Sequence, residues 1–91
     1  LSGARKYAEK GIFPGGAFDN KNHFGPNVKF DMNIDEPAQM LMFDPQTSGG
    51  LLVACAPDVV DDVLQRFRAE GFSSAAVIGD IESGPPGISV T

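Results

Sequence analysis

One stretch of the sequence, DPQTSGGLL, which begins at residue 44, gathers most of the groups that could bind a ligand. Two hydroxyls, those of Thr47 and Ser48, stand beside the glycine pair Gly49 and Gly50, directly before an apolar run. Glycine reaches positive φ at little cost and leaves the backbone uncovered, so N–H groups and hydroxyls here could form a small anion-binding concavity. A plain tight turn explains the same residues, and both interpretations stay open at this point.

The DPQTSGG stretch does not have the layout of a P-loop. A P-loop follows a strand, opens a helix and supplies a lysine to the phosphates. Here the glycines precede an apolar run typical of a strand, and no lysine follows them. We therefore exclude a nucleotide phosphate cradle of that type.

The other reactive side chains do not form a recognisable catalytic set. The only histidine, His23, is predicted to be solvent-exposed or locally hydrogen-bonded in a loop. The only cysteine, Cys55, lies inside the run LLVACA and is predicted to be a buried structural thiol, because free cysteine packs as a small hydrophobe. No Cys/His cluster has zinc spacing, and Ser48 has no evident base. Motif chemistry alone does not indicate a complete enzyme.

Composition limits the function classes. The chain has 91 residues, 42% hydrophobic, and a net charge of −5. We predict one domain over residues 1–91, and, because the chain begins with Leu1, a fragment or a processed chain. The acidic balance and seven scattered basic residues argue against nucleic-acid binding. The apolar runs are too short for a membrane span, and the lone cysteine favours a reducing compartment, so we expect a cytoplasmic protein.

The first half of the chain predicts two helices, a long loop and a strand. A helix over residues 4–10 is expected to be capped by Ser2 and ended by Gly11. Residues 11–27, with four glycines and two prolines, predict an irregular connection whose phenylalanines pack against another part of the protein. Alternation over 28–33 predicts a strand that buries Val28, Phe30 and Met32. A short helix follows from residue 35, with the apolar stripe Ala38, Leu41 and Met42 and core positions Met40 and Phe43.

The second half predicts a strand-helix-strand unit. Residues 51–56 have the composition of a central strand. A helix then begins at residues 57–58, has one apolar face, and ends at Gly71. Its three early aspartates complement the helix dipole and form a solvated face rather than a metal site. Strands over 74–81 and 87–91 follow, so we predict an α+β fold, a mixed sheet with helices packed on one face.

At these motifs the sequence resembles the carboxy-terminal part of the selenophosphate synthetase (selenide, water dikinase) family. That family carries DPQTSGGLL followed by a small-apolar strand. The segments GIFPGGAFDN, APDVVDDVLQRF and AAVIGDI are similar to further family segments in the same order and cover nearly the whole chain. Ala17 stands where the family usually has threonine, which removes a hydroxyl, whereas Asn20 fits the pattern.

The resemblance implies a function for the whole enzyme. The fold would be the C-terminal domain shared with aminoimidazole ribonucleotide synthetase, packed beside an N-terminal nucleotide-binding domain in a protein expected to form a homodimer. The reaction would convert selenide, ATP and water to selenophosphate, AMP and phosphate, with Mg²⁺. The family's nucleophile, lysine and metal-binding aspartates lie upstream, so no catalytic or metal-binding residue is expected here, and Cys55 is not that nucleophile. The isolated chain is expected to be inactive and to bind no cofactor.

The residues expected to face the cleft of that enzyme are Thr47, Ser48, Gly49, Gly50 and Asn20. Two alternatives remain. The chain could be a freestanding small-ligand or protein-binding module of the same fold. It could also belong to a related ATP-dependent enzyme, such as a thiamine-monophosphate kinase or a hydrogenase-maturation protein.

Overall fold

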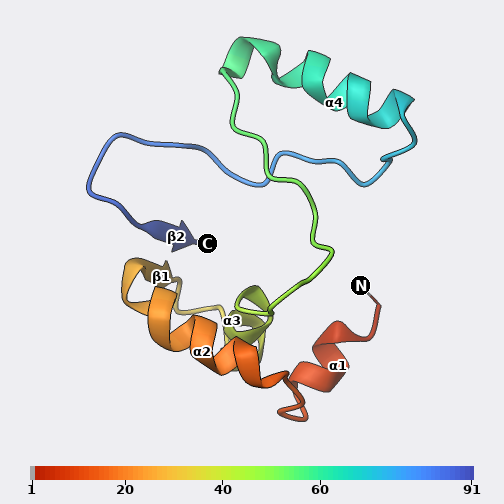
Figure 1. Cartoon of the computed structure of the whole chain (residues 1–91). Helices are drawn as coiled ribbons and strands as arrows, with labels where there is room; N and C mark the ends of the chain where they lie inside the picture. Colours follow the sequence, from red (N-terminus) through yellow and green to blue (C-terminus); the bar gives the residue numbers. More distant parts are fainter. Residues whose placement is uncertain (1) are drawn as a thin grey trace. The chain divides into compact units, whose positions relative to one another are not determined.

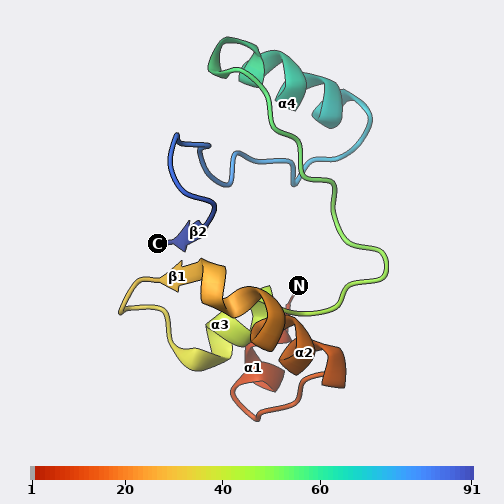
Figure 2. The same cartoon turned by 60° about the vertical axis from the view of Figure 1, so that its left-hand side comes forward.

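The computed structural model describes residues 2–91, which fall into two compact units. The first unit joins residues 2–49 to Pro85–Thr91, and the second is Gly50–Gly84. Figures 1 and 2 show the order of their helices and strands. None of the helices between residues 2 and 91 is long and apolar enough to cross a membrane.

Helix α1, Ala4–Ala8, opens the first unit and is shorter than predicted. Its N-cap is Gly3, with φ of 87°, so the predicted cap at Ser2 is wrong. Gly11 does end the helical segment: it has φ of 68°, and its N–H donates to the Ala8 carbonyl at 2.9 Å. A left-handed glycine after the last turn satisfies carbonyls that the helix leaves unpaired.

Helix α2, Gly15–Phe24, replaces most of the predicted loop, and a 3₁₀ turn, Gly25–Asn27, completes the segment. The prediction of an irregular connection is wrong. Pro14 stands at the N-cap, and its carbonyl accepts the Ala17 N–H at 3.0 Å. Ala17 is fully buried. Packing of this residue in the core favours the helix, although the glycines at its start have low helix propensity. Two phenylalanines of the segment pack edge to face, Phe13 against Phe18.

Strands β1, Val28–Phe30, and β2, Ile88–Val90, form a parallel pair in the described part of the chain. Val28 lies opposite Ile88, and Phe30 lies opposite Val90. The C-terminal strand is thereby confirmed, and the alternation holds for the two partly buried residues of β1. The predicted extension to residue 33 is wrong, since Met32 is fully exposed.

Helix α3, Glu36–Met42, begins at Asp35, whose carboxylate accepts the Ala38 N–H at 3.1 Å. Acidic and proline residues at this end suit the unpaired N–H groups and the helix dipole. Met40 and Phe43 are buried, as predicted, whereas Met42 is 55% exposed and does not belong to the buried stripe. The buried core of the described chain consists of residues from α1, α2 and the end of α3: Ala8, Ala17, Met40 and Phe43.

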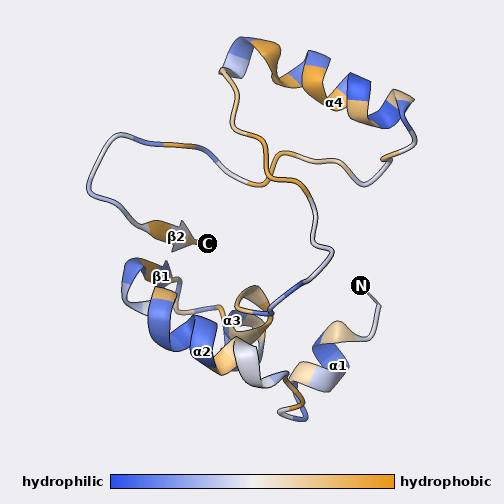
Figure 3. Ribbon diagram, in the orientation of Figure 1, coloured by the Kyte–Doolittle hydropathy of each residue, from blue (hydrophilic) through white to orange (hydrophobic). Residues whose placement is uncertain are grey.

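Helix α4, Val60–Ala69, is the α-helix of the second unit and confirms the predicted helix, although its first residues, Pro57–Val59, form a 3₁₀ turn. Its C-terminus is a Schellman motif: the Gly71 N–H donates to Arg68 at 3.0 Å, and the Phe72 N–H donates to Phe67 at 2.9 Å. The rings of Phe67 and Phe72 pack at 6.1 Å between centroids, which supplies the apolar contact of that motif. The hydropathy colouring of α4 in Figure 3 alternates between apolar and polar positions.

Residues 51–56 and 74–81 do not form the predicted strands. Leu51 is 79% exposed and Ile78 is 81% exposed, and Cys55 is exposed rather than buried. An apolar run indicates burial, but a strand also needs a hydrogen-bonded neighbour, and in the described residues these segments pair with none. The described chain thus contains helices and a two-stranded parallel sheet, which is the coarse α+β content that the sequence predicts.

Candidate functional site

The loop after α3 carries the residues that the sequence singles out. Thr47 and Ser48 form a turn, and they are exposed together with Gly49 and Gly50. Asn20 lies on a different element, α2, and is half-buried. Hydroxyls and backbone in this loop are therefore open to a ligand or to a neighbouring domain.

The glycine pair of the loop does not have the backbone geometry expected of an anion-binding turn. Neither Gly49 nor Gly50 has positive φ. A Cβ on Gly49 would make ordinary contacts with Gln46 at 3.5 and 3.6 Å, and a Cβ on Gly50 would meet nothing within 4 Å. The positive φ considered for these glycines is therefore not adopted. Neither conformation nor space within the described chain requires glycine at these two positions.

Asn20 is tied to the start of the loop by a hydrogen bond. Its Nδ2 donates to the Phe43 carbonyl oxygen at 2.9 Å. Phe43 is the C-cap of α3, where carbonyls have no partner inside the helix. The Asn20 side chain thus supplies a hydrogen-bond donor to the carbonyl at the end of α3, directly before the loop begins.

A second contact joins α2 to the same loop. A Cβ built on Gly16 would lie 3.1 Å from Cγ and 3.3 Å from Cβ of Pro45. The proline ring therefore lies close to the backbone of the helix, and a side chain at position 16 would fit only if one of the two shifted by a few tenths of an ångström. Pattern reasoning missed this pair, although the glycines of GIFPGG were the signal that could have found it.

A groove of about 430 Å³ lies on the first unit beside the β1–β2 pair. Asn20 is the one predicted site residue that lines it, and Thr47, Ser48, Gly49 and Gly50 are not among its walls. Most of the lining is apolar, with Asn20, Asn27 and Asp44 supplying the polar groups; the complete set is Asn20, Phe24, Asn27, Val28, Phe30, Met42, Phe43, Asp44, Ile88 and Val90.

His23 lies on the exposed face of α2 rather than in a loop. Its ring packs edge to face against Phe24, with centroids 4.7 Å apart. The predicted exposure is confirmed and the predicted loop is wrong. The polar residues Asp19, Asn20 and Asn22 lie beside it in a surface hollow.

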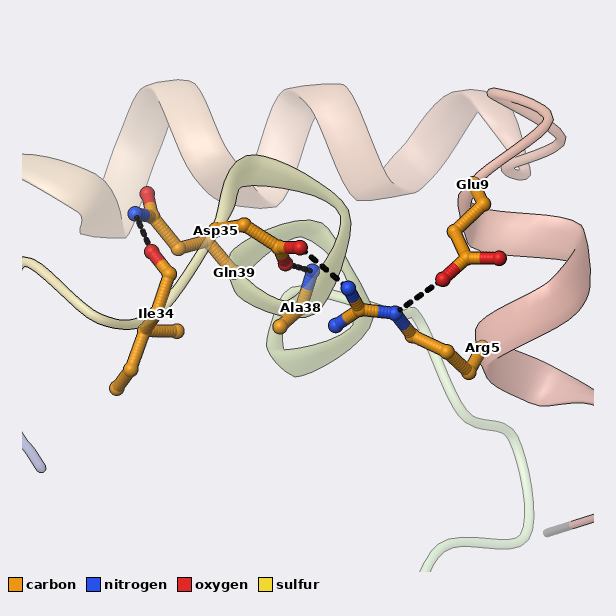
Figure 4. A network of polar contacts seen from close by, with 6 residues as sticks. All are labelled: Arg5, Glu9, Ile34, Asp35, Ala38 and Gln39. Carbon is orange, nitrogen blue, oxygen red and sulfur yellow. Dashed lines mark hydrogen bonds and ion pairs between the residues drawn. The ribbon is translucent and has the colours of Figure 1, made fainter.

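Ion pairs connect the helices that support the loop (Figure 4). Arg5 of α1 pairs with Glu9 at 2.9 Å and also with Asp35, the N-cap of α3. The pKa of Asp35 is lowered, first by the hydrogen bond from Arg5 and then by the Ala38 N–H, and the pKa of Arg5 is raised by its two carboxylate partners. Lys21 of α2 pairs with Glu36 of α3 at 3.1 Å. These charges are paired with one another and join α3 to its two neighbours.

The described residues do not fit a magnesium site. Across residues 2–91, no three His, Cys, Asp or Glu side chains come together in a way that could hold a metal ion. Mg²⁺ takes carboxylate ligands together with substrate phosphates, and no such convergence is found near Thr47 or Ser48. No step of metal or nucleotide chemistry is therefore assigned to this part of the chain.

Comparison with known proteins places the chain in a family. Residues 17–90 match the family described as AIR synthase related protein, C-terminal domain. The chain is 48% identical over 90 residues to selenide, water dikinase from Burkholderia orbicola and 46% identical to that from Pseudomonas straminea. Each match covers 99% of this chain and 25% of the relative, so the chain spans about a quarter of the length of these relatives. No solved structure matches the chain.

The family match covers most of the chain and includes α2 from residue 17 onward, together with the loop that carries Thr47 and Ser48. The likeness to selenide, water dikinases extends over nearly every residue, which confirms the resemblance seen in DPQTSGGLL. The chain therefore belongs to the family of AIR synthase related protein C-terminal domains, and its relatives within that family include selenide, water dikinases.

Proposed function

We propose that this chain is the C-terminal domain of an enzyme that makes selenophosphate from selenide, ATP and water, with AMP and phosphate as the other products. The observation that carries the proposal is the 48% identity to selenide, water dikinase over 99% of the chain. All three phosphorus atoms of ATP are accounted for, one in each product.

Within that enzyme, the domain forms one wall of the active-site cleft. The loop with Thr47, Ser48, Gly49 and Gly50 faces the cleft, and the exposure of these four residues supports this role. Neither φ nor a close contact within the described chain requires glycine at positions 49 and 50. Glycine at these positions would let a ligand or a neighbouring domain approach the backbone closely. Asn20 acts from α2, where it anchors the start of the loop.

The remaining parts of the enzyme supply the phosphoryl-transfer chemistry. Phosphoryl transfer depends on positioning and on cations that neutralise the charge of the oxygens. ATP, Mg²⁺ and the nucleophile are therefore held by an N-terminal nucleotide-binding domain, and the complete protein is a homodimer. The exposed apolar residues of 51–56 and 74–81 support the presence of such partners, because large apolar patches on a protein surface mark interaction sites.

The test is product analysis of the complete enzyme by phosphorus NMR, with selenide and ATP as substrates. We expect selenophosphate, AMP and phosphate from the complete enzyme and no turnover from the 91 residues alone. Thr47→Ala and Ser48→Ala in the complete enzyme should lower turnover while the melting temperature stays unchanged. Selenophosphate formation by the isolated chain would refute the division of labour, and a complete enzyme that makes no selenophosphate would refute the proposed function.

A further inference from the structure

We infer that Gly16 and Asn20 of α2 are positioning residues that fix the start of the Thr47–Ser48 loop from two points. The inference rests on the proposed function for the role of the loop in turnover. The contacts themselves belong to the first unit and do not depend on any ligand.

The two residues act together because of their spacing. Positions 16 and 20 are four residues apart in α2, so they lie on the same face of the helix, one turn apart. Their partners, Phe43 and Pro45, are two residues apart along the chain. One face of α2 therefore contacts both Phe43 and Pro45 at the beginning of the loop. Ala17, fully buried, fixes the same turn of α2 in the core.

Position 16 favours glycine because the two atoms nearest to an added Cβ belong to the ring of Pro45. A Cβ at 3.1 and 3.3 Å from Pro45 carbons would be tighter than ordinary van der Waals contact. The proline ring cannot rotate away, because it is closed onto its own backbone. We expect a side chain at position 16 to shift Pro45 by a few tenths of an ångström, and to displace with it the loop that begins there and carries Thr47 and Ser48.

Gly15 provides a matched control. It precedes Gly16 in the first turn of α2, and a Cβ there would meet nothing within 4 Å. Gly15→Ala and Gly16→Ala make the same chemical change in the same turn, so their difference isolates the contact with Pro45.

The first experiment measures kcat and KM of the complete enzyme with these two variants. Because a misplacement of about 1 Å can cost up to about 100-fold in rate, we expect Gly16→Ala to lower kcat on the order of tenfold with little change in KM for ATP. Gly15→Ala should leave both constants unchanged. Pro45→Ala in the Gly16→Ala background removes the Cγ atom of the clash and should restore part of kcat. Equal losses in both glycine variants, or no rescue by Pro45→Ala, would overturn the inference.

The second experiment reads the position of the loop without reference to activity. A nitroxide spin label is attached at Ser48→Cys in the complete enzyme. Cys55 and every reactive cysteine outside these 91 residues are replaced by serine, so that the label has one site. Gly16→Ala should increase the mobility of the label, and Gly15→Ala should not. An unchanged spectrum in Gly16→Ala would refute the positioning role even if the enzyme makes selenophosphate. The spectral difference would stand even if the proposed function failed.

Asn20 is tested in the same way against Asn22, an exposed asparagine of the same helix. Asn20→Leu removes the donor to the Phe43 carbonyl and should raise label mobility and lower kcat, as in Gly16→Ala. Asn22→Leu should change neither. If the two asparagine variants behaved alike, the hydrogen bond from Asn20 would not be what holds the loop.

Discussion

Phe43 is the residue whose loss should most strongly destabilise the first unit. Its side chain is only 7% exposed, and its ring packs edge to face against Phe30 of β1, with centroids 6.0 Å apart. It also ends α3 and offers its carbonyl to Asn20. Phe43→Ala therefore removes a contact that joins helix, strand and loop, and we expect a large fall in the free energy of unfolding.

The size of this fall can be worked out from burial. A buried aromatic ring removes roughly 200 Å² of surface from water, which at about 25 cal/mol per Å² gives about 5 kcal/mol. Residual compactness of the unfolded chain reduces this to about 3–4 kcal/mol, in line with measured losses for phenylalanine in cores. A chain of this length has a total stability of about 5–14 kcal/mol. The substitution should therefore lower the melting temperature by about 12–30 °C.

The assay is urea denaturation followed by far-UV circular dichroism, with linear extrapolation to water. The matched control is Phe18→Ala, since Phe18 also packs edge to face, against Phe13, but is 50% exposed. Half of the burial and the better helix propensity of alanine predict a loss of about 1 kcal/mol there. Equal losses at Phe43 and Phe18 would show that burial in this core does not set the stability.

Three further predictions concern the second unit, the helix cap and the thiol. Gly71→Ala should cost about 1–2 kcal/mol in the same urea assay, because residue 71 has φ of 91°, and Gly79→Ala, with no such φ, should be neutral; equal effects would contradict the Schellman motif. The lowered pKa of Asp35 means that its stabilising contribution is present above about pH 4 and is lost as the pH falls through its folded-state pKa. The urea midpoints of wild type and Asp35→Asn should therefore converge as the pH falls below about 4, and a constant gap would refute the assignment. Cys55 is exposed and should react with an aromatic disulfide reagent in the native chain within about tenfold of its rate in urea, with Cys55→Ser as the blank; a protected thiol would support the predicted burial instead.

The sequence by itself determined the features that depend on neighbouring residues. The helix α4 and its end at Gly71 follow from apolar spacing and a glycine stop, and both are found. The start of α3 at Asp35 follows from acidic residues and a proline at its N-terminus. The family also follows from motifs in the sequence alone, because DPQTSGGLL is specific enough to identify relatives. These signals are local, so no knowledge of the fold was needed to interpret them.

The tertiary structure alone decided which apolar residues are buried and why the glycines of α2 are there. Met40 is buried and Met42 is exposed, although both are apolar and two residues apart. Gly16 sits in a helix against its own propensity because Pro45, distant in the sequence, packs on its backbone. Burial and close approach are relations between segments far apart along the chain, and a local pattern carries no information about which segments will meet.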